Sequence, residues 1–204
     1  MFTGIVETLG KVVKIEQEQT NTHYFIESEF ASELKIDQSV AHNGVCLTIV
    51  EIQGKVYKVT AISETLQKTH LHTWQVGTQL NLERGMRLGD RLDGHIVQGH
   101  IDQVGVCQQV QDQKGSTVFT FSYDTDKGNL TIEKGSITVN GVSLTVVNSQ
   151  KGMFSVAIIP YTMQHTNLRW IAKGDLVNLE FDVVGKYILR ASQMGIITPK
   201  TFLQ

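Results

Sequence analysis

The sequence predicts an all-β fold: two homologous closed antiparallel β-barrels of Greek-key type, followed by a C-terminal amphipathic helix. Short segments rich in β-branched residues, such as Leu47–Val50 and Ser136–Val139, are typical of strands. Eighteen glycines against two prolines indicate many tight turns. An internal repeat divides the 204 residues into two units, each long enough for a small domain.

The repeat is clearest at Asn43–Val50, which returns as Asn140–Val147. The same offset continues without a gap through the Asn-Leu-Glu motifs that end at Glu83 and Glu180, and more than a third of these positions are identical. Near the start of each unit the offset is two residues shorter, so that Gly4-Ile5-Val6-Glu7 lies over Gly99-His100-Ile101-Asp102. We therefore expect homologous domains over residues 1–92 and 93–185.

Within the first copy the expected strands are short and follow one another at intervals of about ten residues, with Gly, Asn or Asp between them. This spacing favours a closed antiparallel barrel over a βαβ unit, and closure removes sheet edges that would invite aggregation. The expected strands are Ile5–Ile15, Thr22–Glu27, Ser39–His42, Cys46–Gln53, Lys55–Ala61 and Gln79–Leu82.

Three helical segments are expected. Ser63–Leu66 forms a turn that Ser63 could cap, and Pro160–Met163 forms another with Pro160 in its first turn. Val183–Met194 places apolar residues at three- and four-residue spacing, as in an amphipathic helix. The pattern leaves open whether this helix docks on its own chain or in an oligomer, so we assign residues 183–204 as a C-terminal helix and tail for oligomerisation.

Composition excludes several classes of function. The net charge is −2 without a basic cluster, which argues against nucleic acid. No window reaches the roughly 18 apolar residues of a membrane span, and the N-terminus lacks the pattern of a secretory signal. The two cysteines fit neither a disulfide framework nor a zinc site, so we expect no metal and a cytoplasmic setting.

The strongest chemical signal is the pair Cys46 and Ser143, each followed two residues later by a threonine, Thr48 or Thr145. Positions i and i+2 of a strand share a face, so each barrel presents two polar groups that could orient a ligand. The alternative is a hairpin turn at Asn-Gly that leads into a core strand, with Cys46 as an inert buried thiol.

Other repeat positions differ in chemistry. His100 corresponds to Ile5, Tyr161 to Glu64 and Lys134 to Asp37. Shared frame residues predict related pockets for similar ligands, and these differences predict that the two ligands are treated differently. A structural histidine and solvated surface charges are the alternatives.

These residues resemble the riboflavin synthase family. The resemblance is carried by the N-terminal Met-Phe-Thr-Gly-Ile-Val-Glu, by Val-Ala-His-Asn-Gly-Val-Cys-Leu-Thr, by Gly-His-Ile-Val-Gln-Gly-His-Ile-Asp and by the second Asn-Gly-Val-Ser-Leu-Thr. It covers the chain to about residue 190. Where some relatives carry Asp before the last of these motifs, this chain has Asn140.

The resemblance implies a cofactor-free dismutation, in which two molecules of 6,7-dimethyl-8-ribityllumazine exchange a four-carbon unit to give riboflavin and a ribitylaminopyrimidinedione, 5-amino-6-(ribitylamino)uracil. It further implies a homotrimer held by the C-terminal helices, with each active site between the first barrel of one subunit and the second barrel of another. Association with lumazine synthase belongs to the same expectation. The alternative is a lumazine- or flavin-binding antenna or carrier protein without turnover.

The resemblance also implies a set of site residues. His100 is the first choice for proton transfer. The nucleophile for ring addition could be water, a ribityl hydroxyl, Cys46 or Ser143, and positioning is favoured over covalent catalysis for Ser143 and Thr145. Lys134 and Asp182 are more distant contacts. The first pocket comprises Gly4, Ile5, Val6, Ser39, Cys46, Leu47, Thr48, Thr60, Ala61, Ile62, Ser63, Glu64 and Thr65, and the second Gly99, His100, Ile101, Lys134, Ser143, Leu144, Thr145, Ala157, Ile158, Ile159, Pro160, Tyr161 and Thr162.

Overall fold

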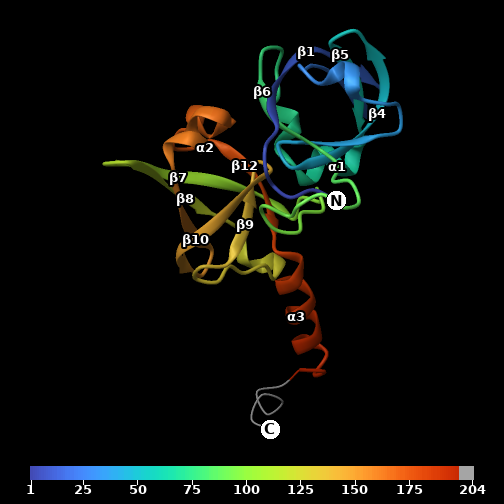
Figure 1. The fold of residues 1–204 in the computed structure, drawn as a ribbon. Coiled ribbons are helices and arrows are strands. Elements are labelled where there is room, and N and C mark those ends of the chain that lie inside the picture. Colours follow the sequence, from blue (N-terminus) through green and yellow to red (C-terminus); the bar gives the residue numbers. More distant parts are fainter. Residues whose placement is uncertain (198–204) are drawn as a thin grey trace.

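A computed structural model describes residues 1–197 and shows two closed β-barrels side by side, with a helix that projects from the second (Figure 1). In the first barrel the strands close in the order β1-β2-β5-β4-β3-β6, all pairs antiparallel, which is a Greek-key arrangement. These strands are β1 (Thr8–Glu18), β2 (Asn21–Glu27), β3 (Ser39–His42), β4 (Val45–Gln53), β5 (Val56–Ala61) and β6 (Gln79–Arg84).

The second barrel repeats this topology, because β10-β11-β8-β7-β12-β9 is the same closed circuit. Its strands are β7 (Gln103–Gln113), β8 (Ser116–Ser122), β9 (Ser136–Val139), β10 (Val142–Gln150), β11 (Met153–Ile158) and β12 (Leu176–Phe181). The helices are α1 (Ser63–Lys68), α2 (Pro160–His165) and α3 (Val183–Gln193), with 3-10 turns at Ala31–Glu33, His70–Thr73, Thr125–Lys127 and Asn167–Trp170. The predicted fold class is confirmed.

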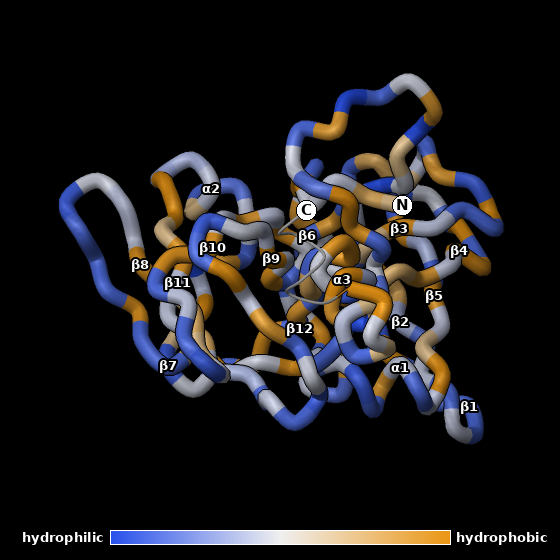
Figure 2. Tube along the Cα trace, turned by 90° about the horizontal axis from the view of Figure 1, so that it is seen from below, coloured by the Kyte–Doolittle hydropathy of each residue, from blue (hydrophilic) through white to orange (hydrophobic). Residues whose placement is uncertain are grey.

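Each barrel encloses its own apolar core. Alternate residues of the strands point inward, and the trace changes between hydrophobic and hydrophilic along its length (Figure 2). Tyr24 and Tyr57 are the largest fully buried side chains of the first core, whereas Phe119, Phe121 and Phe154 are the largest of the second. The core positions therefore follow from the two-residue period of the sequence.

Two local predictions need correction. β1 begins at Thr8 and not at Ile5, because the preceding residues leave the first barrel and Phe2 forms a β-bridge with Val97. Ser63 does not cap α1: the N-cap residue is Ile62, without a side-chain cap, and the Ser63 hydroxyl instead accepts a hydrogen bond from Gln67. Pro160 does occupy the first turn of α2.

The two Asn-Gly turns meet where the barrels touch. A Cβ atom on Gly44 would lie 2.8 Å from the main-chain nitrogen of Gly141, so only glycines permit this approach. The side-chain amide of Asn81 donates to the carbonyl of Asn140, and the amide of Asn178 donates to the carbonyl of Asn43. The repeated motif thus forms the seam between the barrels as well as a hairpin turn.

Helix α3 continues directly from β12 and points away from both barrels (Figure 1). The Asp182 carboxylate accepts a hydrogen bond from the Val184 N–H and caps the helix, while Lys186 forms an ion pair with Asp102 at 3.0 Å. None of the helix side chains is buried. Residues 198–204 of the predicted C-terminal helix and tail lie outside the described residues. No helix in the described part of the chain is long and apolar enough to span a membrane.

Candidate functional site

The outer face of β4 carries the polar pair predicted from the sequence. Leu47 and Ile49 point into the first core, so Cys46 and Thr48 point outward, half-buried and exposed. Pairing of β4 with β5 begins only at Ile49, opposite Val59, although β5 continues to Ala61. The barrel wall therefore opens beside Cys46 and Thr48, and we call this opening with its outer surface the first face.

The second barrel opens at the corresponding place. Pairing of β10 with β11 begins at Val146, opposite Val156, so that Ser143 and Thr145 have no partner on β11. Thr145 is exposed and Ser143 half-buried, as their counterparts are in the first barrel. We call this opening the second face.

Exposed apolar side chains border both faces. Ile62, 52% exposed, follows β5 beside the first face, and Ile159 and Tyr161, 58% and 68% exposed, follow β11 beside the second. Each face thus combines hydroxyl or thiol groups with an apolar rim, and small-molecule sites combine polar and apolar groups in this way.

The N-terminal segment and the segment that links the barrels each cross to the other barrel. The Ser143 N–H donates to the carbonyl of Gly4 (2.7 Å), and the Cys46 N–H donates to the carbonyl of Gly99 (2.9 Å). A Cβ atom on Gly99 would lie 2.6 Å from the Cβ of Cys46, so the contact requires glycine. Within one chain, Gly4, Ile5 and Val6 therefore join the second face, and Gly99, His100 and Ile101 join the first. This reverses the expected grouping.

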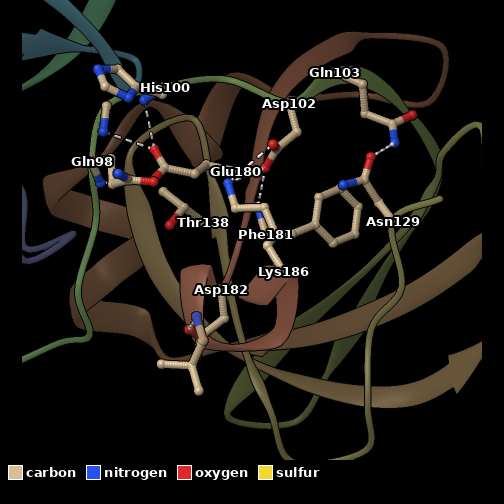
Figure 3. Close-up of polar contacts among 12 residues, drawn as sticks. Gln98, His100, Asp102, Gln103, Asn129, Thr138, Glu180, Phe181, Asp182 and Lys186 are labelled. Carbon is tan, nitrogen blue, oxygen red and sulfur yellow. Dashed lines mark hydrogen bonds and ion pairs between the residues drawn. The ribbon is translucent and has the colours of Figure 1, made fainter. Parts of the chain in front are cut away.

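Two buried carboxylates hold these crossing segments. Glu83 accepts hydrogen bonds from the N–H groups of Thr3 and Gly4, and Glu180 accepts from those of Gln98, Gly99 and His100 (Figure 3). Burial raises the pKa of both carboxyls, while the main-chain donors act in the opposite direction. The Asn-Leu-Glu repeat showed the equivalence of these residues, but not their role.

His95 is a candidate site residue that the sequence prediction did not select. Its Nδ1 lies 2.6 Å from Oγ of Ser143, and its Nε2 lies 3.2 Å from Oγ1 of Thr138. Burial lowers the pKa of the imidazole, and the nearby Asp182 carboxylate partly offsets this. The only signal for His95 was its place in Gly-His-Ile-Val-Gln-Gly-His.

His100 is exposed on the first-face side, and its ring points away from Thr138 and Asp182 (Figure 3). It therefore does not meet Ser143 within one chain. Lys134 is exposed at a turn with φ of 62°, the conformation that Asp37 adopts with φ of 68° at the equivalent turn. Asp182 caps α3, as described above, and lies near His95.

Several predicted site residues lie inside the barrels. Leu47, Ala61 and Ile101 belong to the first core and Ile158 to the second, while Leu144 packs against the second core. Their contacts with a ligand would have to come from the main chain. Other predicted residues face outward. Beside the first face these are Ser39, Cys46, Thr48 and Thr60, and next in the chain come Ile62, Ser63, Glu64 and Thr65. Beside the second face these are Ser143, Thr145 and Ala157, and next in the chain come Ile159, Pro160, Tyr161 and Thr162.

A cavity of about 580 Å³ lies at the seam between the barrels, bordered by Trp74 of one repeat and Trp170 of the other. None of the predicted site residues lines it. Its size alone therefore does not make it the functional site.

The fold and the two faces define a class of protein: a duplicated six-stranded barrel with two related polar faces. The lumazine binding domain family matches the chain twice, over residues 3–85 and 98–182. The chain therefore belongs to the lumazine-binding domain family and carries two copies of the domain.

Relatives over most of the chain are riboflavin synthases. That of Actinobacillus pleuropneumoniae is 39% identical over 189 residues, which cover 92% of this chain and 88% of the relative. That of Bacillus subtilis (strain 168) is 31% identical over 191 residues, covering 93% and 89%. A crystal structure of LumP complexed with riboflavin superposes with a TM-score of 0.82 at 24% identity, covering 89% of this chain and 99% of that one, and this likeness shows the shared fold.

Proposed function

We propose that the chain is a riboflavin synthase, an enzyme that converts two molecules of 6,7-dimethyl-8-ribityllumazine into riboflavin and 5-amino-6-(ribitylamino)uracil without a cofactor. The observation that carries this proposal is the pair of faces, built alike but carrying different groups. Two copies of one substrate need two similar sites, and a donor and an acceptor need those sites to differ. Cys46 on one face and Ser143 on the other meet both requirements.

The openings in the barrel walls suit the substrate. Where β4 leaves β5, its strand edge can pair with the N–H and C=O groups of a pyrimidinedione ring, much as it would with another strand. Ile62 on one face and Tyr161 on the other offer apolar contact to the ring. Binding of this kind orients the reacting rings, and orientation supplies a large part of the rate in such bimolecular steps.

The reaction moves a four-carbon unit from one lumazine to the other, so atoms and electrons balance without an external oxidant. It requires removal of a proton from the 7-methyl group of one ring, which is acidic because its carbanion delocalises into the ring. On the second face the Ser143 hydroxyl and the His95 imidazole, 2.6 Å apart, form a route for this proton. His100 is the proposed proton carrier on the first face, and Cys46 and Ser143 are candidate nucleophiles for ring addition.

The proposal includes a homotrimer in which the first face of one subunit meets the second face of another. Helix α3 supports it, because Val184, Tyr187 and Ile188 are exposed on a helix with no buried side chain. Such apolar surface usually marks an interface. Sedimentation with and without added lumazine synthase tests both the trimer and the expected association with that enzyme.

A cytoplasmic setting is also part of the proposal. Cys46 and Cys107, one in each barrel, are free thiols. Free thiols are usual in proteins of the reducing cytoplasm.

The second candidate is a binding protein without turnover, favoured by the close superposition on LumP. Incubation of the chain with the lumazine alone separates the two candidates. An enzyme yields the absorbance of riboflavin, whereas a binding protein changes the fluorescence of the lumazine and forms no flavin.

A further inference from the structure

A chain of three hydrogen-bonding side chains ends at the first face. Thr60 lies on β5 one residue beyond the last pair with β4, at the edge of the opening. Its hydroxyl Oγ1 lies 2.8 Å from Nδ1 of His23, and Nε2 of His23 lies 3.0 Å from a carboxylate oxygen of Glu18. His23 is 8% exposed, while the Glu18 carboxylate faces solvent.

For a neutral His23 imidazole, the carboxylate partner determines the tautomer and therefore which group donates. An ionised carboxylate only accepts hydrogen bonds, so Nε2 of His23 carries the proton that Glu18 receives. In the neutral imidazole Nδ1 is then an acceptor, and the Thr60 hydroxyl donates to it. The free lone pairs of Thr60 Oγ1 remain available to accept a hydrogen bond at the opening.

The second barrel lacks this chain. β2 pairs His23 with Thr60, and β8 likewise pairs Val118 with Ala157. Glu18 opposes Asn21 at the end of the β1–β2 hairpin, where Gln113 opposes Ser116 in the second barrel. The counterparts of Glu18, His23 and Thr60 are therefore Gln113, Val118 and Ala157, of which two are apolar.

We propose that Thr60, oriented by His23 and Glu18, is a hydrogen-bond acceptor for an N–H or O–H group of the ligand, and that it distinguishes the first face from the second. Thr60 contacts the ligand, while His23 and Glu18 are positioning residues. The inference rests on the proposed function, because it takes the ligand to be a ribityllumazine. It adds a reason why two identical molecules bind the two faces differently.

The test uses variants of the protein in which one face is blocked. Thr145→Trp places a bulky side chain on the exposed second face and leaves the first face open. Thr48→Trp blocks the first face and leaves the second open. In the chain with the first face open, Thr60→Val should weaken lumazine binding about three- to tenfold, the effect of one hydrogen bond. Thr60→Ser should restore the affinity. His23→Leu should weaken binding to a similar extent, and the double variant no further, because both changes remove one oriented acceptor.

The matched experiment rebuilds the three hydrogen-bonding residues on the other face. In the protein whose second face is open, the triple variant Gln113→Glu, Val118→His and Ala157→Thr should bind the lumazine more tightly.

A lumazine with a methyl group in place of the ribityl group identifies the donor. The effect of Thr60→Val persists if the donor is the ring N–H and disappears if it is a ribityl hydroxyl. Unchanged affinity in Thr60→Val, or additive effects of Thr60→Val and His23→Leu, would overturn the inference while leaving the proposed function intact. Failure of the unmodified chain to bind the lumazine at all would overturn both.

Discussion

The His95 imidazole joins two hydroxyl groups of the second barrel, Ser143 on β10 and Thr138 on β9. Burial lowers its pKa, so it is neutral near pH 7 and able to accept a proton. In the first barrel the counterparts of Ser143 and Thr138 are Cys46 and Ala41, so the pair of hydroxyl groups that holds this imidazole is not repeated there. This difference gives the second face a half-buried imidazole linked to a hydroxyl group, whereas the histidine beside the first face, His100, is exposed.

We expect His95→Gln to lower the maximal rate of riboflavin formation by about 10² to 10⁴, the usual contribution of a general acid or base. The affinity for the lumazine should change much less. Exchange of the 7-methyl protons in deuterated water measures the proton transfer itself, and His72→Gln, at an exposed histidine of the first barrel, is the control. A normal exchange rate in His95→Gln would refute this role.

At the residue scale, the sequence was sufficient for side chains whose direction depends on strand alternation alone. Cys46 and Thr48 share the outer face with Leu47 directed inward, as the two-residue period requires. It was not sufficient for contacts between segments distant in the chain. The bond from His95 to Ser143 and the crossing of Gly4 to the second face depend on how the two barrels pack, and no local pattern encodes that packing.

At the scale of elements, the Asn-Gly turns show the same limit. The sequence indicated a hairpin, which is present, but the turns also meet each other at the seam. His70 and Asn167, equivalent in the repeat, complete this seam: Nε2 of His70 lies 3.1 Å from the side-chain oxygen of Asn140, and the Asn167 amide donates to that of Asn43. Burial lowers the pKa of His70 to about 4.

This pKa makes the stability of the seam depend on pH. The unfolded chain takes up a proton at His70 below about pH 6.5, whereas the folded chain does so only near pH 4, so the free energy of unfolding falls as the pH drops through this range. His70→Asn copies the second repeat and should reduce the loss of stability between about pH 7 and pH 4.5 by about 2 to 3 kcal/mol.

Denaturant unfolding of both proteins at the two pH values provides the measurement. The wild type and His70→Asn share one fold. Titration of Glu83 and Glu180, whose pKa values are raised, therefore contributes equally to the pH dependence of both proteins. Parallel pH curves for the two proteins would show that His70 is not responsible.

At the scale of the whole molecule, α3 is the element whose presence was predictable and whose partner was not. The spacing of apolar residues gave a helix over Val183–Met194, and the structure has one over Val183–Gln193. Its role in a trimer remains a proposal.

Deletion of residues 183–204 should convert the trimer into smaller species and abolish turnover, because each proposed active site needs barrels from two chains. Binding of the lumazine should persist in part, since each face belongs to a single barrel together with a crossing segment of the same chain. Sedimentation and fluorescence titration measure these effects. A truncated monomer that still forms riboflavin would contradict the proposed assembly.

The central claim is that two different faces, on different barrels, act together on two molecules of the same substrate. Mixing the two blocked chains, Thr48→Trp and Thr145→Trp, tests it most directly. Each chain alone should bind the lumazine and form no riboflavin. After subunit exchange, mixed trimers contain sites with both faces open, and the mixture should recover about a quarter of the wild-type rate. Riboflavin formation at the wild-type rate by either blocked chain alone would contradict the claim.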